Sequence, residues 1–106
     1  MGQITSAKTV NPDAIHVIDG DTIDLNGQRF RLVGFDTPET YRAKCSYEKA
    51  LGDEATSRMR ELVVSGLPLD LVVLPGRDKY RRGLARLYIG HANAADIMIS
   101  ERLARP

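Results

Sequence analysis

The sequence has few of the features that point to a particular class of protein. Its 106 residues include one cysteine, Cys45, and only six aromatic residues, four Tyr and two Phe. A single thiol cannot form an internal disulfide or a multi-cysteine metal motif, so Cys45 is expected to be a small buried side chain at the edge of a helix. No apolar run approaches the roughly 18 residues of a membrane span, so no membrane partner is expected.

Net charge, repeats and linkers are also nearly absent. Fifteen Lys and Arg against fourteen Asp and Glu give a net charge of +1. The length of 106 residues and the lack of repeats and linkers predict one domain over 13–106, preceded by an N-terminal extension over 1–12. A monomer is expected. The opening "MGQITSAKTV" lacks the apolar centre of a secretory leader. The protein is therefore expected to be cytoplasmic if Met1 is the native start, and secreted or periplasmic if a leader has been removed.

The charges that are present are unevenly distributed. From Asp13 to Asp24 there are four Asp and no Lys or Arg, whereas Arg77 to Arg86 holds five basic residues and one Asp. If folding brings these segments together, acids form one wall of a site and guanidinium groups the other. Such a site suits a metal ion beside a phosphate.

The dipeptide Asn26-Gly27 predicts a two-residue β-hairpin turn between "TIDL" (22–25) and "QRFRLVGF" (28–35). This turn places opposite charges on one face of the hairpin and apolar side chains on the other. It also brings Arg31 to the same end of the hairpin as Asp21. The predicted pairs are Leu25 with Gln28, Asp24 with Arg29, Ile23 with Phe30, Thr22 with Arg31, and Asp21 with Leu32.

Periodicity predicts the other elements. These are strands over 15–17, 69–74 and 84–89, a helix over 47–65 that starts only at Asp53 if Gly52 weakens its first turn, and a final helix capped by Asn93. The order predicts a small β-rich α+β fold: a five-stranded Greek-key barrel of the OB type, with a packed helix after the third strand and a short C-terminal helix. Periodicity alone is also consistent with another α+β sheet.

Two acids are candidate metal ligands. Asp21 shares strand parity with apolar residues, and a bound cation is one of the few ways to keep a buried carboxylate ionised. Asp36 follows the paired strand at the same end. With the main-chain carbonyl of Thr37 and waters, these oxygens suit Ca²⁺ or Mg²⁺. The alternative is that "DGD" (19–21) is an ordinary turn between two strands.

Pro38 makes the chain from Asp36 to Glu39 a stiff bend, which would let Glu39 deprotonate a water near the metal. Arg31 and Arg82 are candidate phosphate ligands, because bidentate guanidinium donors stabilise charge on the equatorial oxygens. Taken alone, each of these residues is better explained as a solvated loop or strand position, and it is their convergence with Asp21 and Asp36 that favours a site.

Three segments, "VIDGDTI" (17–23), "FRLVGFDTPET" (30–40) and "DKYRRGLARLY" (78–88), resemble the sequence blocks of the staphylococcal nuclease (thermonuclease) family, in order and with similar spacing. The resemblance spans about 13–104 and implies an OB-fold nuclease that uses Ca²⁺ to cut DNA and RNA, leaving 3′-phosphate and 5′-hydroxyl ends. The roles it implies are metal ligation by Asp21, Asp36 and the Thr37 carbonyl, general-base catalysis by Glu39, phosphate binding by Arg31 and Arg82, nucleotide contacts by Lys79 and Tyr80, and an acid near the metal at Asp19.

Two departures and one alternative accompany this resemblance. Arg81 stands where the family has Gly. If that turn requires a positive φ, an arginine there destabilises the turn by roughly 1 to 2 kcal/mol. The loop would then relax and displace Arg82, or Arg81 would compete with Arg82 for the same substrate phosphate. The chain also stops at "ERLARP", where better-known members continue, so a short or C-terminally truncated member is expected. The alternative function is a non-catalytic OB module that binds single-stranded nucleic acid or a protein.

Overall fold

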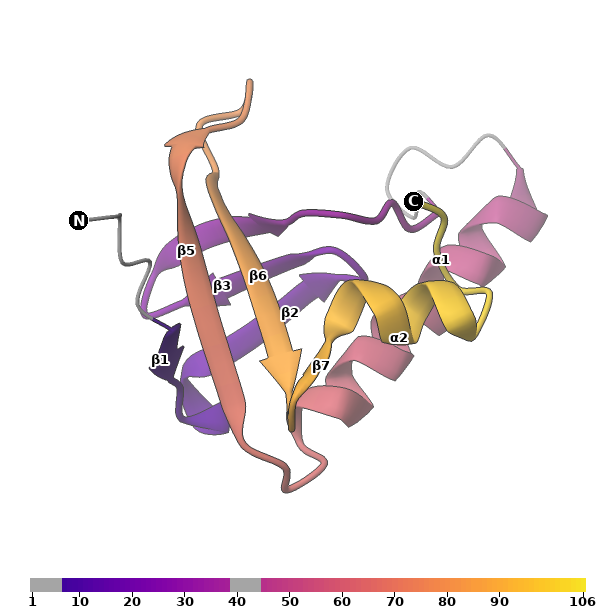
Figure 1. Ribbon diagram of the computed structural model, residues 1–106. Coiled ribbons are helices and arrows are strands. Elements are labelled where there is room, and N and C mark those ends of the chain that lie inside the picture. Colours follow the sequence, from indigo (N-terminus) through magenta and orange to yellow (C-terminus); the bar gives the residue numbers. More distant parts are fainter. Residues whose placement is uncertain (1–6, 39–44) are drawn as a thin grey trace.

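Strands and helices follow one another in nearly the predicted order (Figure 1). The computed structural model describes residues 7–38 and 45–106. The elements are β1 (Ala7–Thr9), the 3₁₀ turn η1 (Pro12–Ala14), β2 (Ile15–Asp19), β3 (Thr22–Leu25), β4 (Gln28–Leu32), α1 (Ser46–Val63), β5 (Leu69–Arg77), β6 (Gly83–Ile89), β7 (Ala92–Asn93) and α2 (Ala94–Ser100).

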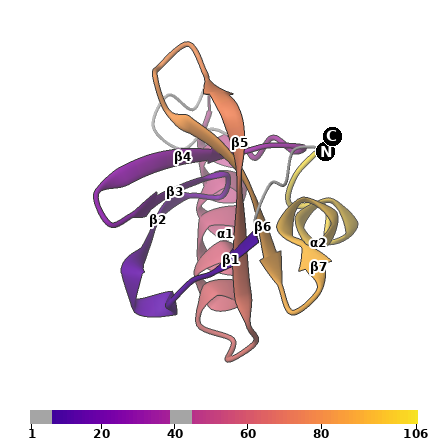
Figure 2. The same cartoon turned by 60° about the vertical axis from the view of Figure 1, so that its left-hand side comes forward.

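The strands form one curved sheet with the order β1-β5-β6-β4-β3-β2, and β7 pairs with β6. Its two outermost strands, β1 and β2, are consecutive in the chain and joined through η1, so the sheet bends back on itself, as the two views show (Figures 1 and 2). The predicted count of five strands is not confirmed, because residues 7–38 and 45–106 contain seven. The additional ones are the three-residue β1, separated from β2 by η1, and the two-residue β7.

The hairpin β3–β4 has the predicted register. Leu25 pairs with Gln28, Asp24 with Arg29 and Thr22 with Arg31. Asn26 and Gly27 both have positive φ, 51° and 83°, as a type I′ turn requires. Beyond the last strand pair, the Leu32 N–H donates to the Asp21 carbonyl at 2.8 Å, which fixes Asp21 at the end of the hairpin.

Both predicted helices are present, but the alternative start of α1 at Asp53 is wrong. The helix begins at Ser46 and passes through Gly52, which is buried and whose carbonyl accepts from the Thr56 hydroxyl at 2.9 Å. The weak helix propensity of glycine therefore does not interrupt α1 at this buried position. Asn93 caps α2 as predicted, because its side chain accepts from the Ala95 N–H at 2.9 Å.

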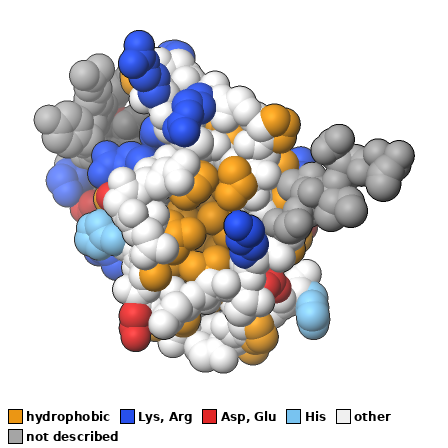
Figure 3. All heavy atoms as spheres, turned by 90° about the vertical axis from the view of Figure 1, so that its left-hand side faces the viewer, with side chains coloured by type: hydrophobic (Ala, Val, Ile, Leu, Met, Phe, Trp, Pro, Cys, Tyr) orange, Lys and Arg blue, Asp and Glu red, His pale blue; other side chains and the backbone are white. Residues whose placement is uncertain are grey.

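The core lies between the curved sheet and the two helices. Its fully buried large side chains are Ile23, Leu32, Met59, Leu69, Leu87 and Met98. Cys45 departs from the expectation, since it is exposed just before α1. On the face shown in Figure 3, apolar side chains gather at the centre, and Lys and Arg side chains lie at the upper edge, the end where β5 and β6 extend as a hairpin (Figure 1). Among the described residues, no helix is long and apolar enough to cross a membrane.

Candidate functional site

The turn from Asp19 to Asp21 connects β2 to β3 and packs tightly against the next part of the site. A Cβ atom at Gly20 would lie 2.6 Å from the Thr37 methyl carbon and 3.0 Å from the Ala55 Cβ. Only glycine fits there without displacing its neighbours. Within the turn, the Asp19 carboxylate accepts from the Asp21 N–H at 3.2 Å. The glycine between the two acids therefore allows Asp21 to approach Thr37.

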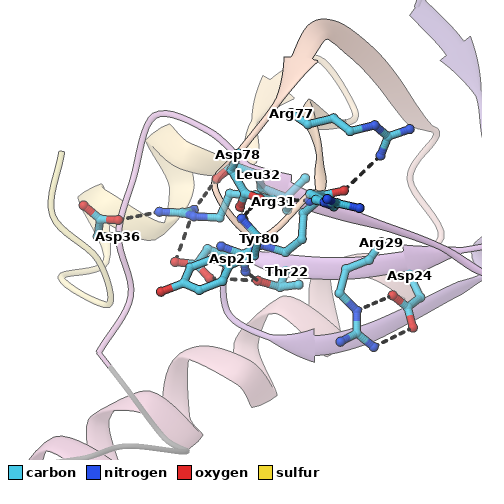
Figure 4. A network of polar contacts seen from close by, with 12 residues as sticks. Asp21, Thr22, Asp24, Arg29, Arg31, Leu32, Asp36, Arg77, Asp78 and Tyr80 are labelled. Atoms are coloured by element: carbon cyan, nitrogen blue, oxygen red, sulfur yellow. Dashed lines mark hydrogen bonds and ion pairs between the residues drawn. The ribbon is translucent and has the colours of Figure 1, made fainter.

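Arg31 connects the two predicted metal ligands. Its Nη1 lies 3.2 Å from Asp21 Oδ2 and its Nη2 pairs with Asp36 Oδ1 (Figure 4). Nη1 also donates to the Leu32 carbonyl. The side chains of Arg31 and Asp21 are 19% and 14% exposed, whereas that of Asp36 is 58% exposed. The two acids thus converge on one cationic group, with Asp21 the more enclosed of the two.

The environment of Asp21 opposes its ionisation. Burial raises the pKa of Asp21 from 3.8 to about 6, and the neighbouring Asp19 acts in the same direction. The positive charge of Arg31 and the Thr37 N–H, which donates to Asp21 Oδ2 at 3.3 Å, act in the opposite direction. The net effect shows that Arg31 alone does not fully compensate the enclosed carboxylate. A further cation at this position would lower the cost of ionising it.

Asp36 is fixed by the C-terminal end of the described chain rather than by a neighbouring strand. The Asp36 N–H donates to the Arg105 carbonyl at 2.8 Å, and the Arg105 N–H donates back to the Asp36 carbonyl at 3.0 Å. This isolated bridge joins segments almost seventy positions apart. The backbone that follows β4 is therefore held at Val33, whose N–H donates to the Ala85 carbonyl, and again at Asp36 by the pair with Arg105.

The turn between β5 and β6 is organised by one carboxylate, Asp78. Its Oδ1 accepts from the backbone N–H groups of Tyr80 and Arg82, both at 2.9 Å, and its Oδ2 accepts from Arg82 Nε at 2.6 Å. Burial acts to raise the pKa of Asp78, but the hydrogen bonds from Arg82 and Tyr80 hold it below its usual value. Sequence reasoning missed this role, although an Asp at the start of a turn is a recognised sign of such side-chain-to-backbone bonding.

Arg81 has a φ of 65°, so this turn does require the left-handed conformation that was considered for the position where the family has glycine. Its carbonyl accepts from Arg77 Nη1 at 3.0 Å, and its side chain is exposed. Arg82 is not displaced: its Nη1 donates to the Thr22 hydroxyl at 3.1 Å, and its guanidinium carbon lies 5.3 Å from the centre of the Tyr80 ring. Asp78 therefore keeps Arg82 in place despite the strained neighbour.

These elements surround a cleft of about 1140 Å³. The predicted site residues that line it are Asp19, Asp21, Arg31, Asp36, Thr37, Lys79, Tyr80 and Arg82. Glu39, the predicted general base, lies outside the described residues, as the chain is described to Pro38 and again from Cys45. Further lining residues, which sequence reasoning missed, come from the start of α1 and from the C-terminal segment: Tyr47, Glu48, Leu51, Arg102, Leu103, Ala104 and Arg105.

The donor set is compatible with a hard divalent cation. Asp21 and Asp36 both contact the Arg31 guanidinium, and the Thr37 N–H donates to Asp21 Oδ2, which places the backbone of Thr37 beside that acid. Carboxylate and carbonyl oxygens are the ligands that Ca²⁺ and Mg²⁺ prefer. Within 7–38 and 45–106, no three His, Cys, Asp or Glu side chains are grouped closely enough to form a metal site on their own. Two acids and a carbonyl would therefore form an open site that waters complete.

Comparison with known proteins connects this cleft with nucleases. Residues 29–106 match the sequence pattern of the family described as "Staphylococcal nuclease homologue". The chain is 39% identical over 103 residues to endonuclease YncB of Bacillus subtilis, covering 92% of this chain and 48% of that protein. It is 38% identical to the SPbeta prophage-derived endonuclease YokF of Bacillus subtilis, covering 83% and 31%. With the thermonuclease of Staphylococcus hyicus the identity is 30%, covering 96% and 62%. The chain thus spans less than two thirds of each of these relatives.

Proposed function

Because this chain belongs to the family of staphylococcal nuclease homologues, whose domain is an OB-fold, we propose that it is a Ca²⁺-dependent endonuclease. It hydrolyses phosphodiester bonds of single-stranded DNA and RNA and leaves 3′-phosphate and 5′-hydroxyl ends. The observation that carries this proposal is the convergence of two carboxylates and two arginines on one cleft, since phosphodiester hydrolysis needs charge neutralisation and a held phosphate.

The arginines bind the scissile phosphate in this account. Each guanidinium presents paired donors to non-bridging oxygens and stabilises the charge that develops as water attacks. Arg82 is already oriented by Asp78 toward the cleft. Arg31 is engaged by Asp21 and Asp36, and it would give up part of that pairing when those acids hold a cation.

Asp21, Asp36 and the Thr37 carbonyl would hold the Ca²⁺, which when bound polarises the phosphate and offsets its negative charge. Glu39 would accept a proton from the attacking water, a role that rests on its spacing from Asp36 across the stiff Thr37-Pro38 segment. The raised pKa of Asp21 supports its role as a cation ligand, because an enclosed carboxylate ionises most readily when a cation is bound beside it.

The proposal is tested by cleavage of end-labelled single-stranded DNA and RNA in Ca²⁺ and in excess chelator. Cleavage should require Ca²⁺, fall by about 10² or more in Glu39→Gln, and be retained in the matched surface variant Arg86→Gln. The products should carry 5′-hydroxyl groups that a polynucleotide kinase labels without prior phosphatase treatment. Equal rates in Ca²⁺ and chelator, or an undiminished Glu39→Gln variant, would refute the proposal.

A second candidate function is a non-catalytic OB module that binds single strands. Tyr80 favours it, because its ring is 66% exposed and flanked by Lys79 Nζ at 5.2 Å and by Arg82, an arrangement on which a base can stack. The two functions differ in their response to Ca²⁺. A binding module should show no Ca²⁺-dependent rise in melting temperature and no cleavage, whereas the nuclease should show both.

A further inference from the structure

A second, smaller hollow adjoins the cleft beside Tyr80. It has a volume of about 330 Å³ and is lined by Ile18, Asp19, Thr22, Arg29, Tyr80 and Arg82. Asp19, Tyr80 and Arg82 also line the larger cleft, so the two depressions share a wall. We call the smaller one the side hollow. A chain molecule bound at Arg82 in the cleft can therefore continue past Tyr80 into the side hollow.

The position of Arg29 matches this continuation. Arg29 and Arg31 are two residues apart on β4, so their side chains project from the same face of the strand, from Cα atoms about 6.6 Å apart. Their guanidinium groups have different partners: that of Arg29 pairs with Asp24, and that of Arg31 pairs with the acids of the cleft. Arg31 lines the cleft and Arg29 lines the side hollow, so β4 presents one guanidinium to each depression.

Asp24 holds Arg29 in a defined orientation. It accepts from Arg29 Nε at 2.8 Å and from Nη2 at 3.1 Å, as the dashed lines in Figure 4 show. A guanidinium bound through these two nitrogens directs its third, Nη1, away from the carboxylate. The Arg29 side chain remains 51% exposed. Arg29 therefore keeps donors available to a ligand although its own charge is balanced by Asp24.

The other walls of the side hollow suit the remaining parts of a nucleotide. Tyr80 offers an exposed aromatic ring, and Ile18 offers a partly buried apolar side chain. Bases stack on aromatic rings with little regard to their identity. Asp19 is the one carboxylate in the lining, against the two guanidinium groups of Arg29 and Arg82.

From this geometry we propose that the side hollow is a subsite for the nucleotide adjacent to the scissile phosphate, in which Arg29 binds that nucleotide's phosphate and Tyr80 stacks on its base. The inference rests on the proposed nuclease function and specifies its substrate class: strands that extend past the cut on the side-hollow side. Long single strands are therefore better substrates than dinucleotides, and Arg29 supplies part of that preference.

The test compares a dinucleotide with tetranucleotides, one of which carries a neutral methylphosphonate in place of the phosphate next to the scissile bond on the 5′ or the 3′ side. In Arg29→Gln, the ratio of kcat/KM for the tetranucleotide to that for the dinucleotide should fall about three- to tenfold relative to wild type, mainly through KM. The matched control Arg86→Gln removes one exposed positive charge from β6 and should leave the ratio unchanged.

The methylphosphonate makes the test specific to one contact. With the neutral linkage on the side that occupies the side hollow, wild type and Arg29→Gln should give the same ratio, since the charge that Arg29 recognises is gone. The inference is overturned if Arg29→Gln and Arg86→Gln lower the ratio equally, or if neither methylphosphonate position removes the difference between wild type and Arg29→Gln.

Binding measured without turnover separates this inference from the proposed function. Fluorescence anisotropy of a labelled tetranucleotide in chelator should show weaker binding to Arg29→Gln than to Arg86→Gln, whether or not the chain cleaves DNA. If cleavage in Ca²⁺ is absent but this difference persists, the catalytic proposal fails and the subsite stands. If cleavage is normal and the two variants bind the tetranucleotide equally, the subsite fails and the nuclease stands.

Discussion

Two arginines reach the cleft from regions that are built differently. Arg31 belongs to β4, and its chain neighbours Phe30 and Leu32 are 3% and 0% exposed in the core. Arg82 belongs to the turn between β5 and β6, where the side chain of Asp78 fixes the backbone. The first region is held by the core of the domain, and the second by a few hydrogen bonds to one carboxylate.

The charge balance of the two arginines differs in the same way. Arg31 is paired with Asp21 and Asp36, the acids proposed to hold a cation, whereas Arg82 is paired with Asp78, which does not line the cleft. If Asp21 and Asp36 hold a cation as proposed, a change at Arg31 is expected to alter cation binding and phosphate binding together, because Arg31 pairs with both acids. A change at Arg82 is expected to alter phosphate binding alone, because its partner Asp78 lies outside the cleft lining. The proposed roles of the two arginines are therefore separable by experiment.

The largest expected effect comes from replacing each arginine with lysine, which keeps the charge but loses the paired donors. Both Arg31→Lys and Arg82→Lys should lower kcat/KM for single-stranded DNA by about 10² to 10³. A Ca²⁺ titration of the rate should show a changed half-saturating concentration only in Arg31→Lys. A similar shift in both variants would contradict the separation of roles, and Arg86→Lys serves as the control.

In the region around β4, the raised pKa of Asp21 predicts that the free energy of unfolding of the protein depends on pH. This pKa is about 6 in the folded protein against 3.8 for an ordinary Asp, so the neutral form is favoured by folding. Its contribution to stability is present below about pH 4 and is lost as the pH rises through about 6. In chelator, Asp21→Asn should raise the free energy of unfolding by roughly 2 to 3 kcal/mol at pH 7.5 and by much less at pH 4.5.

Urea unfolding at these two pH values measures this difference, and Glu54→Gln, at an exposed position in the interior of α1, is the control. A gain in Asp21→Asn that is equal at pH 4.5 and pH 7.5 would show that ionisation of Asp21 is not the cause.

In the turn, removal of the organising carboxylate should reduce activity without unfolding the domain. Asp78→Ala deletes the acceptor for the Tyr80 and Arg82 N–H groups and for Arg82 Nε, so Arg82 loses its fixed orientation. The rate of single-stranded DNA cleavage should fall about 10- to 30-fold, because misplacement of a positioned group is costly. Circular dichroism should show an unchanged fold. A fully active Asp78→Ala variant would mean that the turn does not depend on this residue.

The smallest effect is expected from Arg81, at the same turn. Replacing it with glycine removes the strain of a positive φ and should stabilise the protein by about 1 kcal/mol, less the added entropy of the unfolded chain. Urea unfolding measures this gain. The same substitution at Arg86, inside β6, should destabilise the protein. Destabilisation by Arg81→Gly would indicate that its side chain makes contacts that offset the strain.

The parts of the fold that depend on neighbouring residues could be predicted from the sequence. The β3–β4 register follows from Asn26-Gly27 and from alternation, and the α2 cap follows from Asn93. Strand β1 was not predicted, because its three exposed residues have no periodicity of their own and exist as a strand through pairing with β5. The start of α1 was uncertain because burial of Gly52 is a tertiary effect that propensity does not contain.

The candidate site shows the same division. Its acids and arginines were identified from residue type and spacing, and the structure brings those within the described residues to one cleft, apart from Arg81. Sequence reasoning could not find the bridge between Asp36 and Arg105, because that contact joins distant parts of the chain. The sequence placed Arg31, Asp21 and Asp36 at the same end of the hairpin, but it did not predict that one guanidinium pairs with both acids, since that depends on the path of the chain after β4.

We propose above all that Asp21 helps to hold a cation beside a phosphate bound by Arg31 and Arg82. The most direct test of this proposal is the initial rate of single-stranded DNA cleavage as a function of Ca²⁺ concentration for wild type and Asp21→Asn. We expect a saturable Ca²⁺ dependence in wild type and, in Asp21→Asn, a rate lowered by about 10² or more with a higher Ca²⁺ requirement. Superimposable Ca²⁺ curves for the two proteins would contradict it.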